Sequence, residues 1–229
     1  MSEISVTRLS GSVSSWMALG MVLLVGWDPS DASAQDKGLE VLNQAAVRYR
    51  DVETLCADFT QHLYVPLLGG EHTGTGRLCQ AKPNLFAMRF DNPEGDLIVV
   101  DGMFAWVYFP SNDEKTVLKT SADRSAGGRD FHREFLENPG AKYEITYESA
   151  EDVEKWSTHR LRMVPKRSMS YRFATIWIDR GAPVLRRIQM EEANGNVRTI
   201  TMENVIFDAD PGSDFFMFTP PSGALVMVR

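Results

Sequence analysis

Short segments with a two-residue hydrophobic period follow one another through most of this chain. Ala57 to Leu63 alternates between apolar and polar side chains, and runs rich in β-branched and aromatic residues recur nearly to the C-terminus. Turn sequences such as Gly69-Gly70 and Asn194-Gly195 separate many of them. Parallel strands would need a helix between them, and the spacing leaves no room for one. The sequence therefore predicts a sandwich or barrel with strands near 57–65, 73–81, 84–91, 96–101, 103–109, 114–119, 142–149, 158–165, 172–179, 183–192, 196–207 and 214–219.

One segment before the strands has helical periodicity instead. Between Lys37 and Arg50, apolar residues recur at intervals of three and four, namely Leu39, Leu42, Ala46 and Tyr49. This spacing gives a helix one apolar face. We expect this helix to lie on an apolar surface of the strand-rich part.

Residues 121–140 interrupt the strand pattern. Ser121 to Arg129 is polar and glycine-rich, whereas Asp130 to Glu137 predicts a short helix that Asp130 could cap. Phe131 and Phe135 share one face of that helix at the i, i+4 spacing. Two interpretations remain open: a mobile lid with an aromatic face, and a helix that permanently plugs one end of a barrel.

The N-terminal residues do not resemble part of the fold. Trp16 to Trp27 is a 12-residue apolar run, too short for an ordinary transmembrane helix. Ala32-Ser33-Ala34 follows it and matches the small-residue pattern at signal-peptide cleavage sites. We therefore expect a signal peptide over residues 1–34 and one exported domain over 35–229. The alternative is a short membrane anchor that is not cleaved, which the single basic residue before the run, Arg8, leaves open.

Charge and motifs argue against several function classes. The net charge is −7 and no basic run of five or more residues occurs, so we expect no nucleic-acid partner. The four histidines lack metal-ligand spacing, and no G-x-S-x-G motif is present. The glycines at 69–76 lack the G-K-[ST] ending of a phosphate loop. We expect no metal, no cofactor and no catalytic site.

The two cysteines, Cys56 and Cys79, both lie in the expected exported part. An even number of cysteines in an oxidising compartment suggests a disulfide across a hairpin. Two buried free thiols are the alternative. A redox role is not expected because the chain has no C-x-x-C pair.

Large apolar side chains are concentrated on alternating strand positions. Phe86, Met88 and Phe90 share one strand face, and Trp106 and Tyr108 share another. Most such residues form ordinary core, but methionine is also suited to a pocket that re-packs around variable ligands. The pattern therefore suggests an apolar cavity inside the strand-rich fold.

Several blocks together resemble the outer-membrane lipoprotein carrier (LolA) family over about residues 38–224. The blocks are Ala57-Asp-Phe-Thr-Gln61, Gly76-Arg-Leu78, Lys82-Pro-Asn-Leu-Phe86, Leu97-Ile-Val-Val-Asp-Gly102, Trp106-Val-Tyr108, and Phe216-Met-Phe-Thr-Pro-Pro221 followed by Gly223. The resemblance implies a half-open antiparallel barrel of about eleven strands, with helices covering its open side. It also implies a non-enzymatic, monomeric periplasmic carrier of acylated cargo.

The resemblance implies roles for particular partners and residues. Cargo would pass from an inner-membrane release complex to an outer-membrane acceptor. Lys82 stands where the family usually has an arginine that holds the lid, so we expect Lys82 to tether the lid. Lysine cannot donate to two carbonyls as a guanidinium does, so the lid would be held more weakly, or by Arg77 or Arg89 instead. Other classes remain open: an envelope-sensing or glycolipid-binding module, and a hydrolase in an acidic rim. The expected cavity residues are Phe59, Phe86, Met88, Phe90, Trp106 and Tyr108, and the expected lid residues are Phe131, Phe135 and Leu136.

Overall fold

The computed structural model describes residues 29–122 and 131–228. All its strands belong to one open sheet, ordered β12-β6-β5-β4-β3-β2-β1-β11-β10-β9-β8-β7. Neighbouring strands are antiparallel except β12 and β6, which are parallel. The strands are β1 (Thr54–Val65), β2 (Gly70–Ala81), β3 (Leu85–Asn92), β4 (Leu97–Asp101), β5 (Phe104–Tyr108), β6 (Thr116–Ser121), β7 (Tyr143–Val153), β8 (Trp156–Pro165), β9 (Tyr171–Asp179), β10 (Leu185–Glu192), β11 (Val197–Phe207) and β12 (Leu225–Val228).

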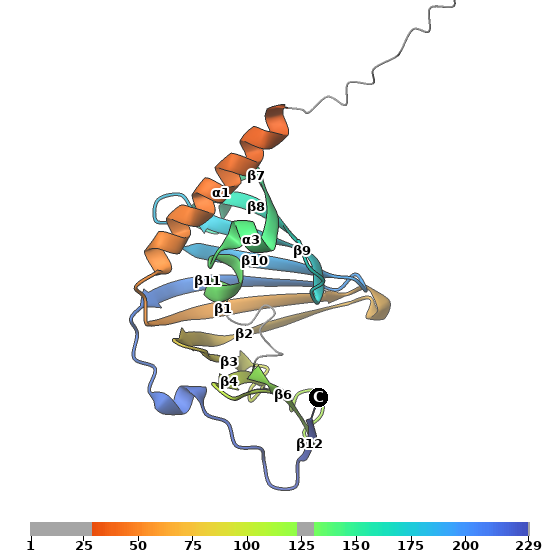
Figure 1. Ribbon diagram of the computed structural model, residues 1–229. Helices are drawn as coiled ribbons and strands as arrows, with labels where there is room; N and C mark the ends of the chain where they lie inside the picture. The colour runs from red at the N-terminus through yellow and green to blue at the C-terminus, as the bar shows by residue number, and fades with distance from the viewer. Residues whose placement is uncertain (1–28, 123–130, 229) are drawn as a thin grey trace, which may run out of the picture.

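The expected half-open, mainly β fold is confirmed. The sheet has two antiparallel meanders, β1 to β6 and β7 to β11, which meet where β1 pairs with β11. Its two ends do not pair with each other in the described chain, so the sheet is not closed into a barrel (Figure 1). The short helices are α2 (Phe131–Phe135), α3 (Pro139–Lys142), η1 (Pro66–Leu68) and η3 (Ser213–Phe216).

The N-terminal helix α1 (Pro29–Tyr49) packs on the β7 end of the sheet (Figure 1). Leu42 and Tyr49 of the expected apolar face are buried. At Gly38 the helix approaches β7 so closely that an added Cβ would be 2.9 Å from Ile145 Cγ2. The predicted cleavage point after Ala34 falls inside α1, and residues 1–28 of the predicted signal peptide lie outside the described residues. In the described ranges, no helix has both the length and the apolarity to span a membrane.

The C-terminal strand prediction is wrong. Residues 213–216 form η3 and the chain continues in an extended, unpaired path, whereas a strand forms later, at Leu225–Val228. This region follows the outer face of the first meander, so its alternating Phe216 and Phe218 pack on the sheet from outside. Apolar side chains can therefore alternate in a segment that lies on a sheet without belonging to it.

Apolar side chains cover both faces of the sheet. The larger cluster fills the concave face and includes Leu42 and Tyr49 of α1 and Phe135 of α2. The smaller cluster lies on the outer face around Cys56, Cys79 and Phe216. Two buried layers on one sheet explain why apolar residues occupy both faces of some strands.

Candidate functional site

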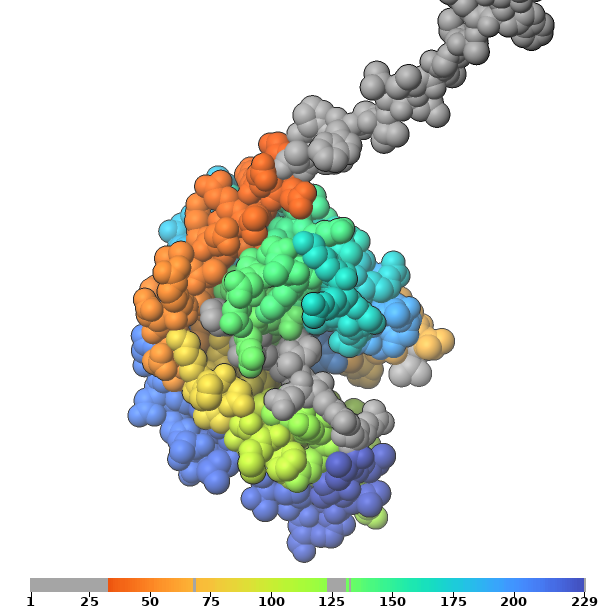
Figure 2. Space-filling model, viewed as in Figure 1, coloured from red at the N-terminus to blue at the C-terminus, as the bar shows by residue number. Residues whose placement is uncertain are grey.

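An apolar hollow of about 320 Å³ lies on the concave face of the sheet. Strands of both meanders contribute to it, and α2 adds Phe131. The space-filling view is hollowed between the part containing β8 and the end that carries β12 (Figure 2). We call the apolar hollow the first hollow. Its lining is mostly apolar and consists of Phe86, Met88, Ile98, Val107, Phe109, Leu118, Phe131, Ser170, Tyr171, Met190, Glu192, Arg198 and Ile200.

A second hollow of about 710 Å³ adjoins the first, and more polar residues contribute to its lining. Phe109 and Arg198 line both hollows, so these two residues mark the junction between them. The other residues of the second hollow come mainly from the β1–β2 hairpin and the chain around β3 to β5: Gln61, Leu63, Val65, Glu71, His72, Thr73, Gly74, Phe90, Pro93, Asp96, Ser111 and Asn112.

The structure brings four of the expected cavity residues to the concave face. Phe86 and Met88 line the first hollow, and Phe90 lines the second. Phe59 is buried beside Phe90 with the ring centroids 4.9 Å apart, and it supports that ring without lining either hollow.

The placement of Trp106 and Tyr108 in the cavity is wrong. Both lie on the outer face, where their rings pack 6.0 Å and 5.6 Å from Phe218. Trp106 Nε1 also donates to Asp101 Oδ2 at 2.7 Å. The intervening Val107 faces the first hollow instead. β5 has large apolar side chains on both faces because the C-terminal segment covers its outer side, so alternation alone gave the wrong face.

Phe131, Phe135 and Leu136, which were expected to form a lid, are all buried. Phe131 contacts Phe86 edge to face at 5.9 Å and lines the first hollow. Phe135 and Leu136 belong to the large core cluster. The expected Asp130 cap and the glycine-rich residues before it lie outside the described residues.

A buried polar cluster that the sequence analysis missed holds α2. Tyr171 Oη donates to Glu134 Oε1 at 3.1 Å, and Tyr143 Oη donates to the same oxygen. Burial raises the pKa of both tyrosines, so both hydroxyls stay protonated and can donate. Lys142 Nζ adds hydrogen bonds to the carbonyls of Arg133 and Glu134. These residues lie 8 to 37 positions apart, and no local motif connects them.

The prediction that Lys82 tethers the lid is wrong. Its Nζ donates to the carbonyl of Arg50 at 2.8 Å and to Glu53 Oε1 at 3.2 Å. Both acceptors belong to the connection between α1 and β1, and the described part of the chain shows no bond from Lys82 to α2. Lys82 follows the end of β2 that pairs with the start of β1, so its side chain reaches that connection.

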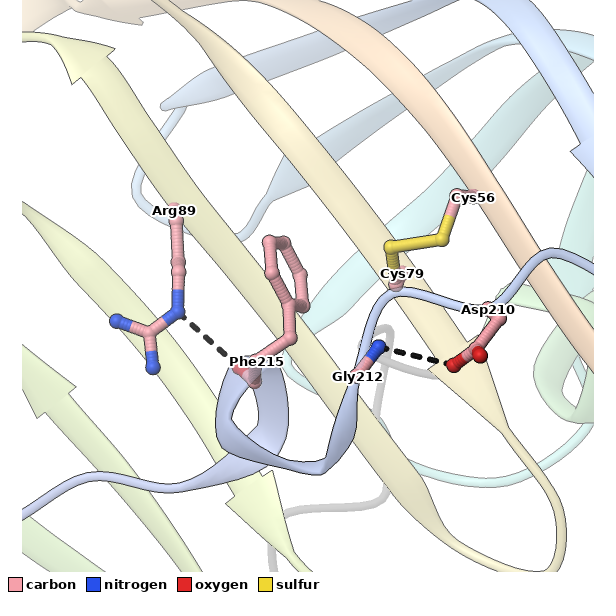
Figure 3. Close-up of a disulfide and its surroundings, with 6 residues drawn as sticks. All are labelled: Cys56, Cys79, Arg89, Asp210, Gly212 and Phe215. Carbon is pink, nitrogen blue, oxygen red and sulfur yellow. Dashed lines mark hydrogen bonds between the residues drawn. A yellow bond between two sulfur atoms is a disulfide. The ribbon is translucent and has the colours of Figure 1, made fainter.

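Arg89, expected as an alternative lid tether, holds the C-terminal segment instead. Its guanidinium donates to the carbonyls of Phe215 at 3.1 Å, Met217 at 2.6 Å and Asp214 at 3.4 Å. The segment passes beside the Cys56–Cys79 disulfide on the same outer face (Figure 3). The two cysteines are directly paired across β1 and β2.

The described residues contain no group of three or more histidine, cysteine or acidic side chains that could hold a metal ion. The geometry provides an apolar hollow, an adjoining hollow with more polar residues in its lining, and a short helix that contributes Phe131 to the first. The fold and the first hollow define a class of open-sheet β protein whose concave face carries an apolar hollow.

Comparison with known proteins specifies the class further. The model of the outer membrane lipoprotein carrier protein LolA matches residues 50–219, and the chain belongs to this family. An outer-membrane lipoprotein carrier protein of Neisseria gonorrhoeae is 28% identical over 197 residues, covering 86% of this chain and 89% of the relative. One from Ralstonia nicotianae is 26% identical over 220 residues, covering 92% and 95%. A crystal structure of an uncharacterized conserved protein from Thermus thermophilus has the same fold, with a TM-score of 0.53, 14% identity, and coverage of 84% and 99%.

Proposed function

We propose that this protein is a non-enzymatic carrier that binds the acyl chains of lipoproteins in the first hollow. It would be exported by its N-terminal signal peptide, act as a monomer in the periplasm, and pass cargo from an inner-membrane release complex to an outer-membrane acceptor. The observation that carries the proposal is the apolar hollow lined by Phe86 and Met88 and closed by Phe131. The names of the Neisseria and Ralstonia relatives support it.

The physical need for such a carrier is large. Each methylene group removed from water contributes about 0.8 kcal/mol of transfer free energy, so bringing a long acyl chain into water costs roughly 10 kcal/mol. A carrier must offset this cost and still release its cargo. A hollow lined by Met88 and Met190 suits that purpose, because methionine side chains re-pack easily around different chains.

Filling the hollow tests the proposal. Leu118, half-buried in its wall, would be replaced by tryptophan, and binding of an uncharged fluorescent apolar probe would be titrated. We expect Leu118→Trp to weaken probe binding about tenfold or more, with an unchanged circular dichroism spectrum. Met103→Trp is the matched control, since Met103 is 70% exposed and does not line the hollow.

Native mass spectrometry of the protein purified from the periplasm provides a second readout. We expect a bound species that carries acyl chains and is lost or reduced in the Leu118→Trp variant. Equal probe binding by both variants, together with a protein that carries no acyl ligand, would refute the carrier function.

A further inference from the structure

The guanidinium of Arg198 lies where the two hollows meet, and it lines both of them. Arg198 is on β11, paired with Leu63 of β1 on one side and with Met190 of β10 on the other. Met190 lines the first hollow and Leu63 the second. A cation therefore lies between the first hollow, whose lining residues are mostly apolar, and the second, to which more polar residues contribute.

The protein supplies little to neutralise this cation. Arg198 Nη1 donates to Gln61 Oε1 at 3.0 Å, and Gln61 is an uncharged partner. Within the described ranges, no carboxylate lies within ion-pair distance of Arg198. A largely desolvated cation is costly unless an anion or several acceptors accompany it. A guanidinium has five donors, so most of them are free for a ligand.

The acidic groups that face the two hollows are engaged elsewhere or lie at the mouth. Asp96 accepts from Ser111 through both its backbone nitrogen at 3.1 Å and its Oγ at 2.7 Å. Glu192 accepts from Asn196 at 3.2 Å, although it attracts Arg198 through space. Glu71 and the titratable His72 are exposed on β2. These acids disfavour a highly charged ligand but leave room for one with a single negative charge.

We propose that Arg198 binds the single anionic group, a carboxylate or a phosphodiester, of an acyl lipid whose chain occupies the first hollow. The head of the lipid lies in the second hollow, whose lining offers polar side chains. This inference rests on the proposed acyl-chain site in the first hollow, and it extends the ligands of that site from lipoprotein acyl chains to a free anionic lipid with a defined orientation. The planar guanidinium suits such a group because it can donate two parallel hydrogen bonds to two oxygens.

Competition against an uncharged apolar dye, N-phenyl-1-naphthylamine, tests this orientation. The competitors are palmitate, lysophosphatidylglycerol and uncharged hexadecanol, measured on the wild type, Arg198→Gln and Arg198→Lys. Arg187→Gln is the control, because Arg187 lies on neighbouring β10, bonds Thr201 Oγ1 at 2.9 Å and Glu154 Oε1 at 3.5 Å, and does not line either hollow.

We expect Arg198→Gln to weaken binding of palmitate, lysophosphatidylglycerol or both by about tenfold, and to leave hexadecanol within a factor of two. Arg198→Lys should restore part of the loss, and Arg187→Gln should have no effect. If Arg198→Gln weakens only palmitate binding, Arg198 binds a carboxylate. If it weakens only lysophosphatidylglycerol binding, Arg198 binds a phosphodiester.

Two outcomes would overturn the assignment while leaving the carrier function intact. Equal losses for all three competitors would make Arg198 a structural residue, and unchanged binding of all three would place the head elsewhere. A wild-type protein that binds neither the dye nor any competitor would overturn the carrier function and this inference together.

Discussion

The hydroxyl of Tyr171 on β9 donates to the carboxylate of Glu134 on α2, with the two oxygens 3.1 Å apart. Tyr143 on β7 donates to the same carboxylate, and its hydroxyl oxygen lies 2.7 Å from that of Tyr171. The far meander thus holds the short helix that brings Phe131 to the first hollow. Glu134 of α2 is thus bonded by this polar cluster, whereas Lys82 bonds Arg50 and Glu53.

Replacing Tyr143 by phenylalanine removes one donor from a buried carboxylate. We expect Tyr143→Phe to lower the free energy of unfolding by about 1–3 kcal/mol and to speed amide hydrogen exchange over residues 131–142. Tyr64→Phe is the control, because Tyr64 is 44% exposed on β1. Exchange as slow as in the wild type would show that apolar contacts alone hold α2.

Reduction of the Cys56–Cys79 disulfide should destabilise the fold. The bond closes a loop of 23 residues, for which the chain-entropy model gives about 3 kcal/mol. We expect a lower urea midpoint in reductant, and a mass increase of about two daltons in the reduced intact protein. The Cys56→Ser/Cys79→Ser variant should be insensitive to reductant. An unchanged midpoint after proven reduction would contradict the expected stabilisation.

Removing the Arg89 guanidinium should release the C-terminal segment from the outer face. Three carbonyls would lose their donors, so we expect Arg89→Ala to raise the rate of chymotryptic cleavage after Phe215 by about tenfold. Arg77→Ala is a matched control, since Arg77 pairs with Arg89 across β2 and β3 and is exposed. Equal cleavage of the two variants would mean that Phe216 and Phe218 suffice to hold the segment.

His159 gives the fold a pH dependence with a definite sign. Burial lowers the pKa of His159, and the nearby Arg180 and Lys37 lower it further. The unfolded chain therefore binds a proton at His159 at a higher pH than the folded one does. Stability should fall as the pH falls below about 6.5, the ordinary histidine value, until the lower folded value is reached.

We expect His159→Gln to show a smaller loss of stability between pH 7.5 and 5 than the wild type, measured by urea unfolding. His72→Gln, at an exposed position on β2, controls for the loss of a histidine as such. If the free energy of unfolding varies with pH equally in the wild type and in His159→Gln, His159 does not contribute to the pH dependence.

Hydrophobic alternation was sufficient to predict most of the strands and some of their faces. It succeeded on β3, where Ala87 and Arg89 face outward and are small or polar, so the inward direction of Phe86 and Met88 is clear. On β5 it failed, because apolar side chains are buried on both faces and periodicity no longer distinguishes them. The covering that creates this ambiguity comes from residues over one hundred positions away.

The missed parts of the site depend on such distant pairings. Arg198 and Gln61 are 137 residues apart, and each looks like an ordinary polar residue in its own strand. Glu134 resembles an exposed helix residue until Tyr143 and Tyr171 are placed around it. The family resemblance indicated a lid but not how it is attached, because Lys82 departs from the usual arginine.

The pairing of β1 with β11 has a consequence for how the chain is made. Gln61 and Arg198 of the partner strand β11 are separated by 137 residues, so there is an interval in which the local β1–β2 hairpin has formed and β11 has not yet joined it. Throughout that interval β1 can pair with β2 but has an open edge on its other side. An unpaired edge is the surface on which strands from other chains pair wrongly. The strand that finally joins the two meanders is therefore also the one whose delay most exposes the newborn chain to aggregation.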